Sequence, residues 1–318
     1  MPFARGPTGE QVHYTVTRST EPPPDLREAP RILFVPSMAS FATMWEAQQK
    51  FFSSSCDVAV VDNRGIAQSA APSGIWRIED MADDVICVLD ALGWDTCHLV
   101  GHSLGQIVVN AAASRAPGRV RSLTWVSPVS LAPLGGVATD CCAPLGIWKL
   151  SGLCKELDLL VACDPKDRIE ASLAINWPAT YLARTAYDGG RGTNRDAVLR
   201  SMMDATRGQG RVPESTLFKQ ALAWVLHRPP SCRLPTLIIV GEEDALVYAQ
   251  RLRSKVTAAQ ERGHAVDFLA VAGPGHNCQT QCAIAVNSAM EAFIVRRHQD
   301  DVDEVSETTR LSGTMMER

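Results

Sequence analysis

The sequence predicts an α/β fold, in which helices cover both faces of a mostly parallel central sheet. Short, uninterrupted apolar runs recur along the chain, and helical patterns lie between them. Strands that are buried on both faces have such continuous runs instead of an alternation of apolar and polar residues. Because strand and helix patterns alternate, we expect parallel strands joined by right-handed crossovers. The alternation is interrupted once, by a long segment without strand patterns.

The predicted elements follow from these patterns in chain order. The chain opens with a hairpin, whose turn is the Gly-Pro-Thr-Gly stretch at 6–9 and whose second strand alternates over 12–16. Buried strands are predicted at 32–35, 58–61, 98–100, 123–126, 237–240 and 266–271. Helices are predicted at 44–52, 78–92 and 105–116.

The interruption divides the chain into a core and an insertion. Residues 131–227 are rich in Ala, Leu and Trp and show no strand pattern, so we expect a helical lid over the sheet. The core then consists of a first part at 1–130 and a second part at 228–298. A polar tail at 299–318 is expected to be disordered.

Composition narrows the class of protein. Hydrophobic residues make up 46% and charged residues 21% of the 318 residues, a balance typical of a soluble globular protein. The net charge of -4 gives no basic footprint for nucleic acid, and no apolar run approaches the roughly 20 residues of a transmembrane helix. The ten cysteines lack Cys-x-x-Cys spacing and no secretory pattern opens the chain, so we expect free thiols in the cytoplasm.

The most informative segment surrounds Ser103. A buried strand runs into Gly101-His102-Ser103-Leu104-Gly105, and an Ala-rich helical stretch follows. A serine hydroxyl is a weak nucleophile, and a sharp strand-to-helix turn exposes it by holding the residue in a strained conformation. The two glycines remove side chains that would collide where strand and helix approach each other. The alternative is a Ser-Gly turn that only starts a helix, which this placement disfavours.

With this segment the chain resembles the α/β-hydrolase superfamily, from about residue 32 to residue 293. A second match is Asp-Asn-Arg-Gly at 62–65, after a predicted strand, which is similar to the family's Asp-x-Arg-Gly segment. We expect a structural role for it. The family has a glycine two residues later, where this chain has Ala67. The resemblance implies that Ser103 is the nucleophile of a serine hydrolase.

The family order of nucleophile, acid and histidine assigns the acid to Asp244. This residue leaves the carboxyl end of a buried strand, where the sites of such sheets gather. Glu242 and Glu243 are rivals, but they lie closer to the strand end and are expected to form the turn. The family's other acid position, at 127–128, holds Ser-Pro and no carboxylate.

The same order assigns the base to His276, which ends a Gly-rich loop after the last predicted strand. Seven histidines compete for this role, and their positions exclude most of them. The role implied for His276 is to accept the Ser103 proton and to return it to the leaving group.

Two backbone amides are expected to form an oxyanion hole. One belongs to Leu104, at the start of the helix that follows Ser103. By position in the family, the other belongs to Met38. The family usually has His-Gly before this position, whereas this chain has Pro36 and Ser37. Because the donor is a main-chain N–H, the change need not remove it, although the missing glycine leaves the loop geometry open.

The resulting hypothesis is a hydrolase that cleaves a carboxylic ester, thioester or lactone through an acyl-serine intermediate, without metal or organic cofactor. The expected substrate is a small molecule with an apolar acyl group. Alternatives that keep the serine are a carbon–carbon bond hydrolase, an acyltransferase, and a slow-turnover receptor or regulatory protein. The oligomeric state is not predicted.

Several apolar residues of the lid could line an acyl pocket or could merely pack the lid against the core. They are Trp148, Leu153, Leu157, Leu159, Leu160, Trp177 and Tyr181.

Overall fold

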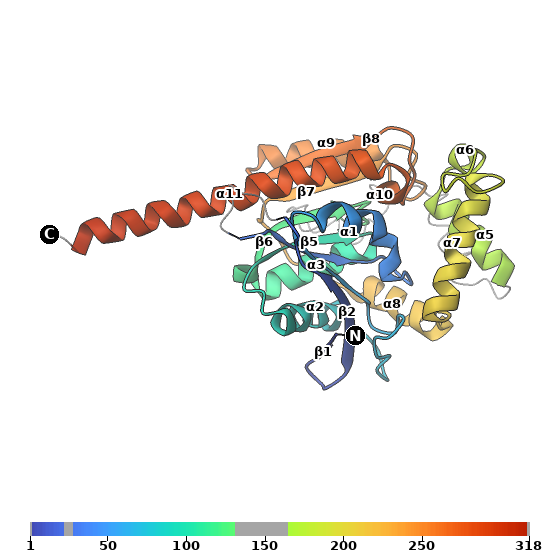
Figure 1. The fold of residues 1–318 in the computed structure, drawn as a ribbon, viewed down its shortest axis with the longest axis horizontal. Coiled ribbons are helices and arrows are strands. Elements are labelled where there is room, and N and C mark those ends of the chain that lie inside the picture. The colour runs from blue at the N-terminus through green and yellow to red at the C-terminus, as the bar shows by residue number, and fades with distance from the viewer. Residues whose placement is uncertain (1, 22–27, 131–164, 317–318) are drawn as a thin grey trace.

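A mostly parallel sheet runs through the molecule in the computed structural model, which describes residues 2–21, 28–130 and 165–316. Within these residues the sheet has eight strands in the order β1-β2-β4-β3-β5-β6-β7-β8. Strand β2 is antiparallel to both of its neighbours, and the other pairs from β4 to β8 are parallel. Helices lie on both faces of this sheet (Figure 1), so the predicted fold class is confirmed.

The strands and the helices predicted at 44–52, 78–92 and 105–116 lie close to their predicted positions, whereas the helices after residue 248 were not predicted individually. The strands are β1 Phe3–Arg5, β2 Gln11–Thr17, β3 Arg31–Val35, β4 Asp57–Val61, β5 Cys97–His102, β6 Val120–Val126, β7 Thr236–Gly241 and β8 Val266–Val271. The helices are α1 Glu46–Phe52, α2 Ile78–Leu92, α3 Leu104–Arg115, α5 Pro165–Asn176, α6 Ala179–Leu182, α7 Asn194–Gln209, α8 Glu214–Leu226, α9 Ala249–Glu261, α10 Cys278–Gln281 and α11 Ala283–Met316. Two short 3-10 helices are η1 Ala42–Trp45 and η2 Pro117–Arg119.

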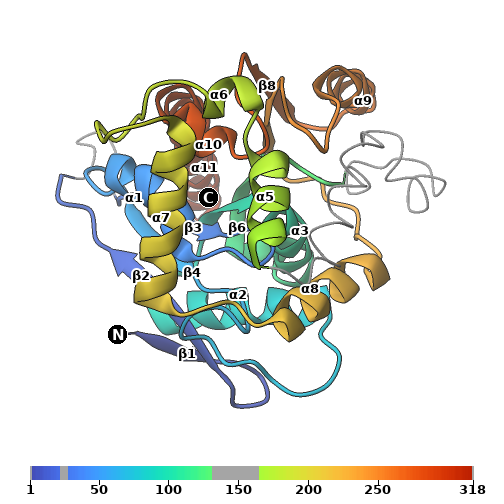
Figure 2. The ribbon, with the colours of Figure 1, turned by 90° about the vertical axis from the view of Figure 1, so that its right-hand side faces the viewer.

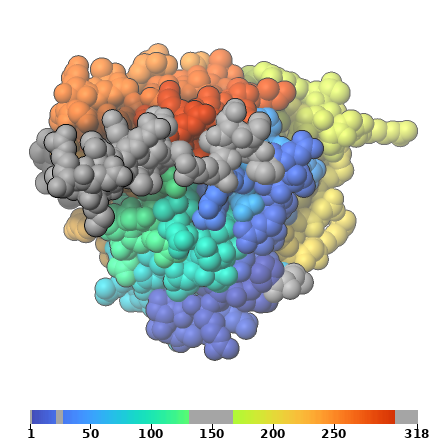
Figure 3. Space-filling view, turned by 60° about the vertical axis from the view of Figure 1, so that its left-hand side comes forward, coloured from blue at the N-terminus to red at the C-terminus, as the bar shows by residue number. Residues whose placement is uncertain are grey.

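The N-terminal hairpin forms as predicted. Strands β1 and β2 pair antiparallel, and the Gly6 amide closes the turn by donating to the Glu10 carbonyl at 2.8 Å. In the space-filling view the hairpin and the β8–α9 region lie at opposite ends of the body (Figure 3), as the strand order requires.

Two hydrophobic cores sandwich the sheet. Successive side chains of a strand point to opposite faces, so an uninterrupted apolar run fills both cores at once. In β3, Leu33 and Val35 join one core together with α2, α3 and α9. Their neighbours Ile32 and Phe34 join the other core together with α1 and α11. The continuous runs in the sequence are explained by this double burial.

The segment between β6 and β7 is helical where the structure describes it. Helices α5, α7 and α8 lie across one end of the sheet (Figure 2), and a single isolated bridge joins Thr185 to Thr193 around the Gly-rich loop at 189–192. Five of the seven expected lining residues lie outside the described residues; they are Trp148, Leu153, Leu157, Leu159 and Leu160.

The C-terminal segment differs from the expected disordered tail. Helix α11 begins against the sheet, where Val286, Met290 and Phe293 are buried. Its backbone then continues as a helix to Met316, away from the body of the molecule (Figure 1). The residues from 299 onward contain no proline and a single glycine, so little in their sequence interrupts the helix.

No helix in the described part of the chain is both long enough and apolar enough to cross a membrane. The described cysteines are free thiols, and Cys56, Cys97, Cys232 and Cys278 are buried. Burial raises the pKa of Cys97 and of Cys278 to about 12, so both remain protonated at neutral pH.

Candidate active site

Ser103 is the single residue between strand β5 and helix α3. Its φ of 53° and ψ of -115° lie in a region that L-residues rarely adopt, which costs of order 1–3 kcal/mol. Backbone hydrogen bonds hold this turn, because the Ser103 amide donates to Val126 at 3.0 Å and the Gln106 amide donates to the Ser103 carbonyl at 3.0 Å. The geometry is the strained strand-to-helix turn that the sequence predicts.

Two glycines make this turn possible. A Cβ atom on Gly101 would lie 2.3 Å from the carbonyl oxygen of Gly105. A Cβ atom on Gly105 would lie 2.3 Å from the carbonyl oxygen of Val35. Both neighbours are backbone atoms, which cannot move aside as a flexible side chain can. The glycines therefore let β5, α3 and the loop after β3 approach to within backbone contact.

Asp244 and His276 meet at the carboxyl ends of β7 and β8. Nδ1 of His276 lies 2.9 Å from Oδ2 of Asp244, and both side chains are buried. The other carboxylate oxygen accepts hydrogen bonds from the amides of Leu246, at 2.8 Å, and Val247, at 3.1 Å. The structure thus brings the predicted acid and base together.

The charge state of Asp244 determines how His276 is protonated. Burial by itself would raise the pKa of this carboxyl, but the nearby His276 charge and the hydrogen bonds hold it below its ordinary value. An ionised carboxylate can only accept, so Nδ1 of His276 is the donor in this pair. The Nε2 atom is then the ring nitrogen that can take up a proton.

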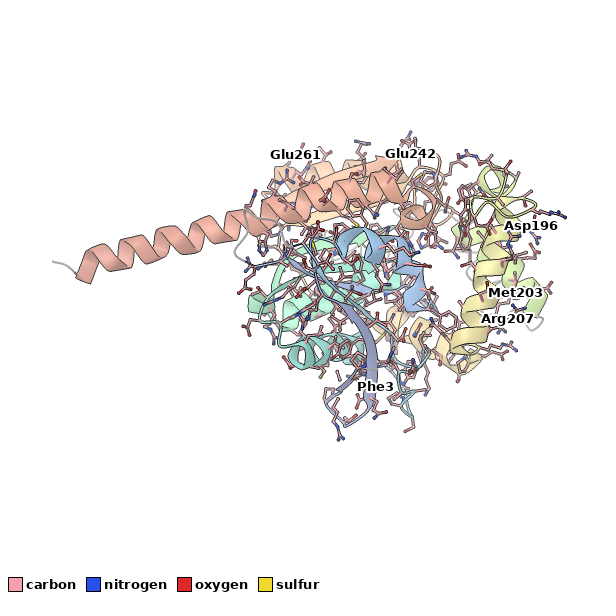
Figure 4. All side chains as sticks on the ribbon, viewed as in Figure 1. Phe3, Asp196, Met203, Arg207, Glu242 and Glu261 are labelled. Atoms are coloured by element: carbon pink, nitrogen blue, oxygen red, sulfur yellow. The ribbon has the colours of Figure 1, made fainter. Side chains whose placement is uncertain are left out.

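The rival acids face solvent. Glu242 and Glu243 are exposed, and Glu242 lies on the outer side of the loop after β7 (Figure 4). Glu243 accepts a hydrogen bond from the hydroxyl of Thr180 at 3.1 Å. Of these three neighbouring carboxylates, Asp244 alone contacts His276.

Two further residues, which the sequence did not single out for this role, hold the backbone of His276. Its carbonyl oxygen accepts hydrogen bonds from Nε2 of His102 at 2.9 Å and from the Ser127 hydroxyl at 2.7 Å. Burial, with the nearby charge of His276, lowers the pKa of His102 to about 3, so this ring is neutral and donates through Nε2. Ser127 adopts a φ of 47°, and it occupies the position where the family has its other acid. The His276 loop is therefore fixed both to the elbow strand and to its neighbour.

The loop after β3 provides the second expected oxyanion donor. The Ser37 amide donates to Sδ of Met44 at 3.4 Å, and the Ala39 amide donates to Oε1 of Gln220 at 2.8 Å. Between them, the Met38 amide makes no hydrogen bond to the residues that the structure describes. Leu104 is the first residue of α3, where helix geometry leaves the amide without an intrahelical acceptor. Both expected donors are therefore left for a ligand.

The missing family glycine leaves this loop without steric conflict. Ser37 is not among the residues of positive φ, so its side chain is tolerated where the family has glycine. The strained position is instead Ala39, with a φ of 51°. The side chain of Asn63, from the Asp-Asn-Arg-Gly segment, donates to the Pro36 carbonyl at 3.0 Å and fixes the start of the loop. That segment therefore supports the site, in line with its expected structural role.

Ser103 and His276 line a common cavity of about 430 Å³, which also includes the Met38 loop. The apolar residues that complete its wall from the insertion are Ile169, Ile175, Met202, Val212 and Leu217. Charged residues at the same wall are Arg168, Arg211 and Glu214. Trp177 and Tyr181, which the sequence offered as lining residues, are not part of this wall. The cavity is large enough for a small organic molecule.

Comparison with known proteins places these features in a family. The pattern of the α/β hydrolase fold matches residues 30–279. Among curated relatives, a protein of Stutzerimonas stutzeri named putative carbamate hydrolase RutD is 27% identical over 246 residues, which is 76% of this chain and 82% of the relative. The N-formylmaleamate deformylase of Pseudomonas putida is 34% identical over 101 residues, 31% of this chain and 38% of that protein. Four further curated relatives, each also named putative carbamate hydrolase RutD, are covered over 44%, 54%, 37% and 37% of their own length.

Solved structures share the fold. The enol-lactonase of Burkholderia xenovorans superposes with a TM-score of 0.69 at 18% identity, covering 92% of this chain and 100% of the enzyme. An esterase of Thermogutta terrifontis superposes with a TM-score of 0.68 at 17% identity, covering 93% of this chain and 98% of the esterase. The family pattern matches most of this chain, and this match shows that the chain belongs to the α/β-hydrolase fold family.

Proposed function

We propose that the protein is a serine hydrolase that cleaves a small ester, thioester or lactone through an acyl intermediate on Ser103. One observation carries the proposal: His276, held by the buried Asp244, lines the same cavity as a serine in a strained elbow. A serine requires a base to become nucleophilic, and a histidine requires a partner that fixes its tautomer. The site contains all three residue types.

In the proposed first step, Oγ of Ser103 attacks the carbonyl carbon of the substrate while Nε2 of His276 accepts the hydroxyl proton. The carbonyl π electrons move to the oxygen, which the amides of Met38 and Leu104 stabilise as an oxyanion. When the carbonyl re-forms, the bond to the leaving group breaks, and His276 returns the proton to that group. Water then repeats the sequence on the acyl-serine and releases the acid.

Asp244 has an electrostatic role in this scheme. The ring of His276 becomes a cation in each half of the reaction, and a buried carboxylate at 2.9 Å stabilises that cation. Its lowered pKa keeps Asp244 ionised at neutral pH. The carboxylate therefore holds the tautomer with Nε2 unprotonated before each attack.

The cavity favours a small substrate with an apolar acyl group. Its wall from the insertion includes the apolar side chains of Ile169, Ile175, Met202, Val212, Pro213 and Leu217, together with the charged residues Arg168, Arg211 and Glu214. The relatives act by name on a carbamate, an enol-lactone and an N-formyl amide, each of which presents a carbonyl carbon to a nucleophile. We include such carbonyl compounds in the proposed substrate range.

The proposed setting is the cytoplasm, and the free thiols in the described residues support it.

The alternative of a slow-turnover receptor would be favoured by an oxyanion loop that has lost its donor, because Pro36 and Ser37 replace the family's His-Gly. An anchored loop with an unengaged Met38 amide supports turnover instead, since the donor that the family requires is retained. We therefore favour an enzyme over a slow receptor.

The test uses the purified protein with a fluorophosphonate probe and nitrophenyl esters of short acyl chains. We expect wild type to be labelled and to hydrolyse the esters, and Ser103→Ala to lose both activities. The matched control is Ser254→Ala, an exposed serine on α9, which should leave both unchanged. A folded wild-type protein that shows neither labelling nor turnover would contradict the proposal.

A further inference from the structure

A buried glutamine on the insertion joins two backbone segments of the core. Gln220, on helix α8, is fully buried. Its Oε1 accepts a hydrogen bond from the Ala39 amide at 2.8 Å, and its Nε2 donates to the Arg64 carbonyl at 3.2 Å. Both ends of the side-chain amide are thus satisfied by main-chain groups of the core, and neither group belongs to its own helix.

We infer that Gln220 is the positioning residue for the oxyanion loop, so that docking of α8 on the core sets the geometry of the Met38 donor. This inference rests on the proposed function. Ala39 directly follows Met38, and its amide belongs to the peptide group that links the two residues. Fixing that peptide group restrains the backbone of Met38 on its C-terminal side. Gln220 acts through this restraint and does not itself touch the reacting atoms.

The loop requires such a restraint because Ala39 has a φ of 51°. This left-handed conformation is unfavourable for a residue with a Cβ atom, and it persists only where surrounding contacts enforce it. Asn63 fixes the start of the loop through the Pro36 carbonyl. Gln220 supplies the matching contact at the other end, so the Met38 amide lies between two anchors.

The anchor point on the core is itself rigid. Arg64 is buried, and its guanidinium makes two hydrogen bonds to Asp84, at 2.8 and 2.9 Å. Gln220 therefore connects the oxyanion loop to the carbonyl of a buried residue whose own side chain is paired with Asp84 of α2. A side chain that spans two fixed points has little freedom to shift.

Helix α8 docks on the same core segment through two more contacts. The Thr216 hydroxyl donates to the Gly65 carbonyl at 3.3 Å, and the Lys219 ammonium donates to the Pro72 carbonyl at 2.8 Å. Leu217, from the same helix, lines the substrate cavity. One helix thus forms part of the substrate wall and holds the oxyanion loop, which couples the seating of the insertion to the chemical step.

The first variant is Gln220→Met, which keeps the length of the side chain and removes both hydrogen bonds. Loss of a complete oxyanion donor costs about 100- to 1000-fold in kcat, so a displaced donor should cost at least about tenfold. We expect KM to change less than about threefold, because the aliphatic wall of the cavity is intact. Nitrophenyl ester kinetics measure both constants.

The second variant, Gln220→Glu, provides a readout that a purely structural role would not move. A protonated glutamic acid keeps the shape of glutamine, with one oxygen to accept from Ala39 and a hydroxyl to donate to Arg64. Burial raises the pKa of a carboxyl group, so lowering the pH should restore this form. We expect kcat of Gln220→Glu, relative to wild type at the same pH, to rise between pH 8 and pH 6, and that of Gln220→Met to stay low.

The matched control is Asn194→Leu, on helix α7. Asn194 is also buried and also bridges two backbone groups, accepting from the Tyr187 amide at 2.8 Å and donating to the Tyr181 carbonyl at 3.0 Å. Both of its partners belong to the insertion. This variant should lose thermal stability while keeping kcat within about threefold of wild type.

The outcomes separate the inference from the proposed function. If wild type neither reacts with fluorophosphonate nor hydrolyses esters, the proposed function fails. If wild type is active and folded Gln220→Met has the same kcat, the inference about Gln220 fails and the proposed function stands. Should Gln220→Met not fold, the pH series of Gln220→Glu decides, and a ratio to wild type that does not change with pH would overturn the inference.

Discussion

The elbow and the oxyanion loop face the same cavity but are built in different ways. The elbow is local: β5, Ser103 and α3 are contiguous in the chain, and the glycines that permit it lie two residues to either side. The oxyanion loop depends on residues far away in the sequence, namely Asn63 and Gln220. A local structure is specified by its own residues, whereas a loop of this kind is specified by its neighbours. The Asp244–His276 pair, the proposed acid and base, lies between these extremes, on two adjacent strand ends.

The largest effect is expected at Asp244, which orients the proposed base, His276. Replacing Asp244 with Asn preserves shape but removes the negative charge, and the amide can donate to Nδ1 and so stabilise the wrong tautomer of His276. We expect kcat for nitrophenyl esters to fall by roughly 1000- to 10000-fold. Glu243→Gln, a change at an exposed neighbour, is the control and should stay within twofold of wild type. A fall of less than tenfold in Asp244→Asn would remove Asp244 from the proposed mechanism.

The next effect probes the contact between the two regions. In Gly105→Ala, the new Cβ would lie 2.3 Å from the Val35 carbonyl oxygen, at the start of the oxyanion loop. Backbone must move, so we expect the free energy of unfolding to fall by about 1–3 kcal/mol and kcat to fall with it. Chemical denaturation and ester kinetics measure the two quantities.

Gly118→Ala is the control for this substitution. A Cβ atom at Gly118 would meet no atom within 4 Å, and the residue has no positive φ. Its stability and kcat should match those of wild type. If Gly105→Ala behaved in the same way, the close approach of α3 and the oxyanion loop would not be a constraint on the fold.

The same contrast explains what the sequence could and could not predict. Strand periods, the two elbow glycines and the order of serine, acid and histidine are signals that can be found along the chain, and they indicate Ser103, Asp244 and His276. The supports of those residues have no such signals, because they join segments that are distant in the chain. A lone glutamine on a helix has no local signature of a bridge to Ala39 and Arg64.

One signal for this bridge is present on α8. Thr216 and Gln220 lie four residues apart, on one face of the helix, and both are fully or almost fully buried. Two polar residues on a face that also contains Leu217 and Ala221 indicate partners beyond the helix. Sequence alone could suggest such partners but could not identify them.

A smaller effect concerns the burial of the elbow strand. Burial, together with the charges of His298 and Arg121, lowers the pKa of His98 on β5 to about 3. In the unfolded chain a histidine takes up a proton near pH 6.5. Between these values only the unfolded state binds the proton, so stability is lost as the pH falls below about 6.5.

The measurement compares wild type with His98→Gln by denaturant unfolding at pH 7, 6 and 5. Each pH unit below about 6.5 should cost wild type up to about 1.4 kcal/mol more than the variant. Comparison with the variant cancels the contributions of other titrating groups. Parallel pH profiles would mean that His98 does not contribute to acid destabilisation.

The smallest effect tests whether strained alanines resemble the strained serine. Ala67, where the family has glycine, has a φ of 47°. The left-handed conformation costs a residue with a Cβ atom about 1–2 kcal/mol. Glycine would relieve that strain, but the unfolded chain gains conformational entropy worth about 0.4–1 kcal/mol. We therefore expect Ala67→Gly to stabilise the protein by about 0.5 kcal/mol, measured by thermal denaturation.

Ala258→Gly gives the opposite sign for the same chemical change. Ala258 lies inside α9, where a glycine costs about 1 kcal/mol. If Ala67→Gly also destabilised the protein, contacts of the Ala67 methyl group would outweigh its backbone strain. Strain at Ser103 differs in kind, because its side chain cannot be exchanged for glycine without removing the proposed nucleophile. A strained alanine outside the site can be relieved, whereas the elbow has to retain its strain for as long as the reaction depends on Ser103.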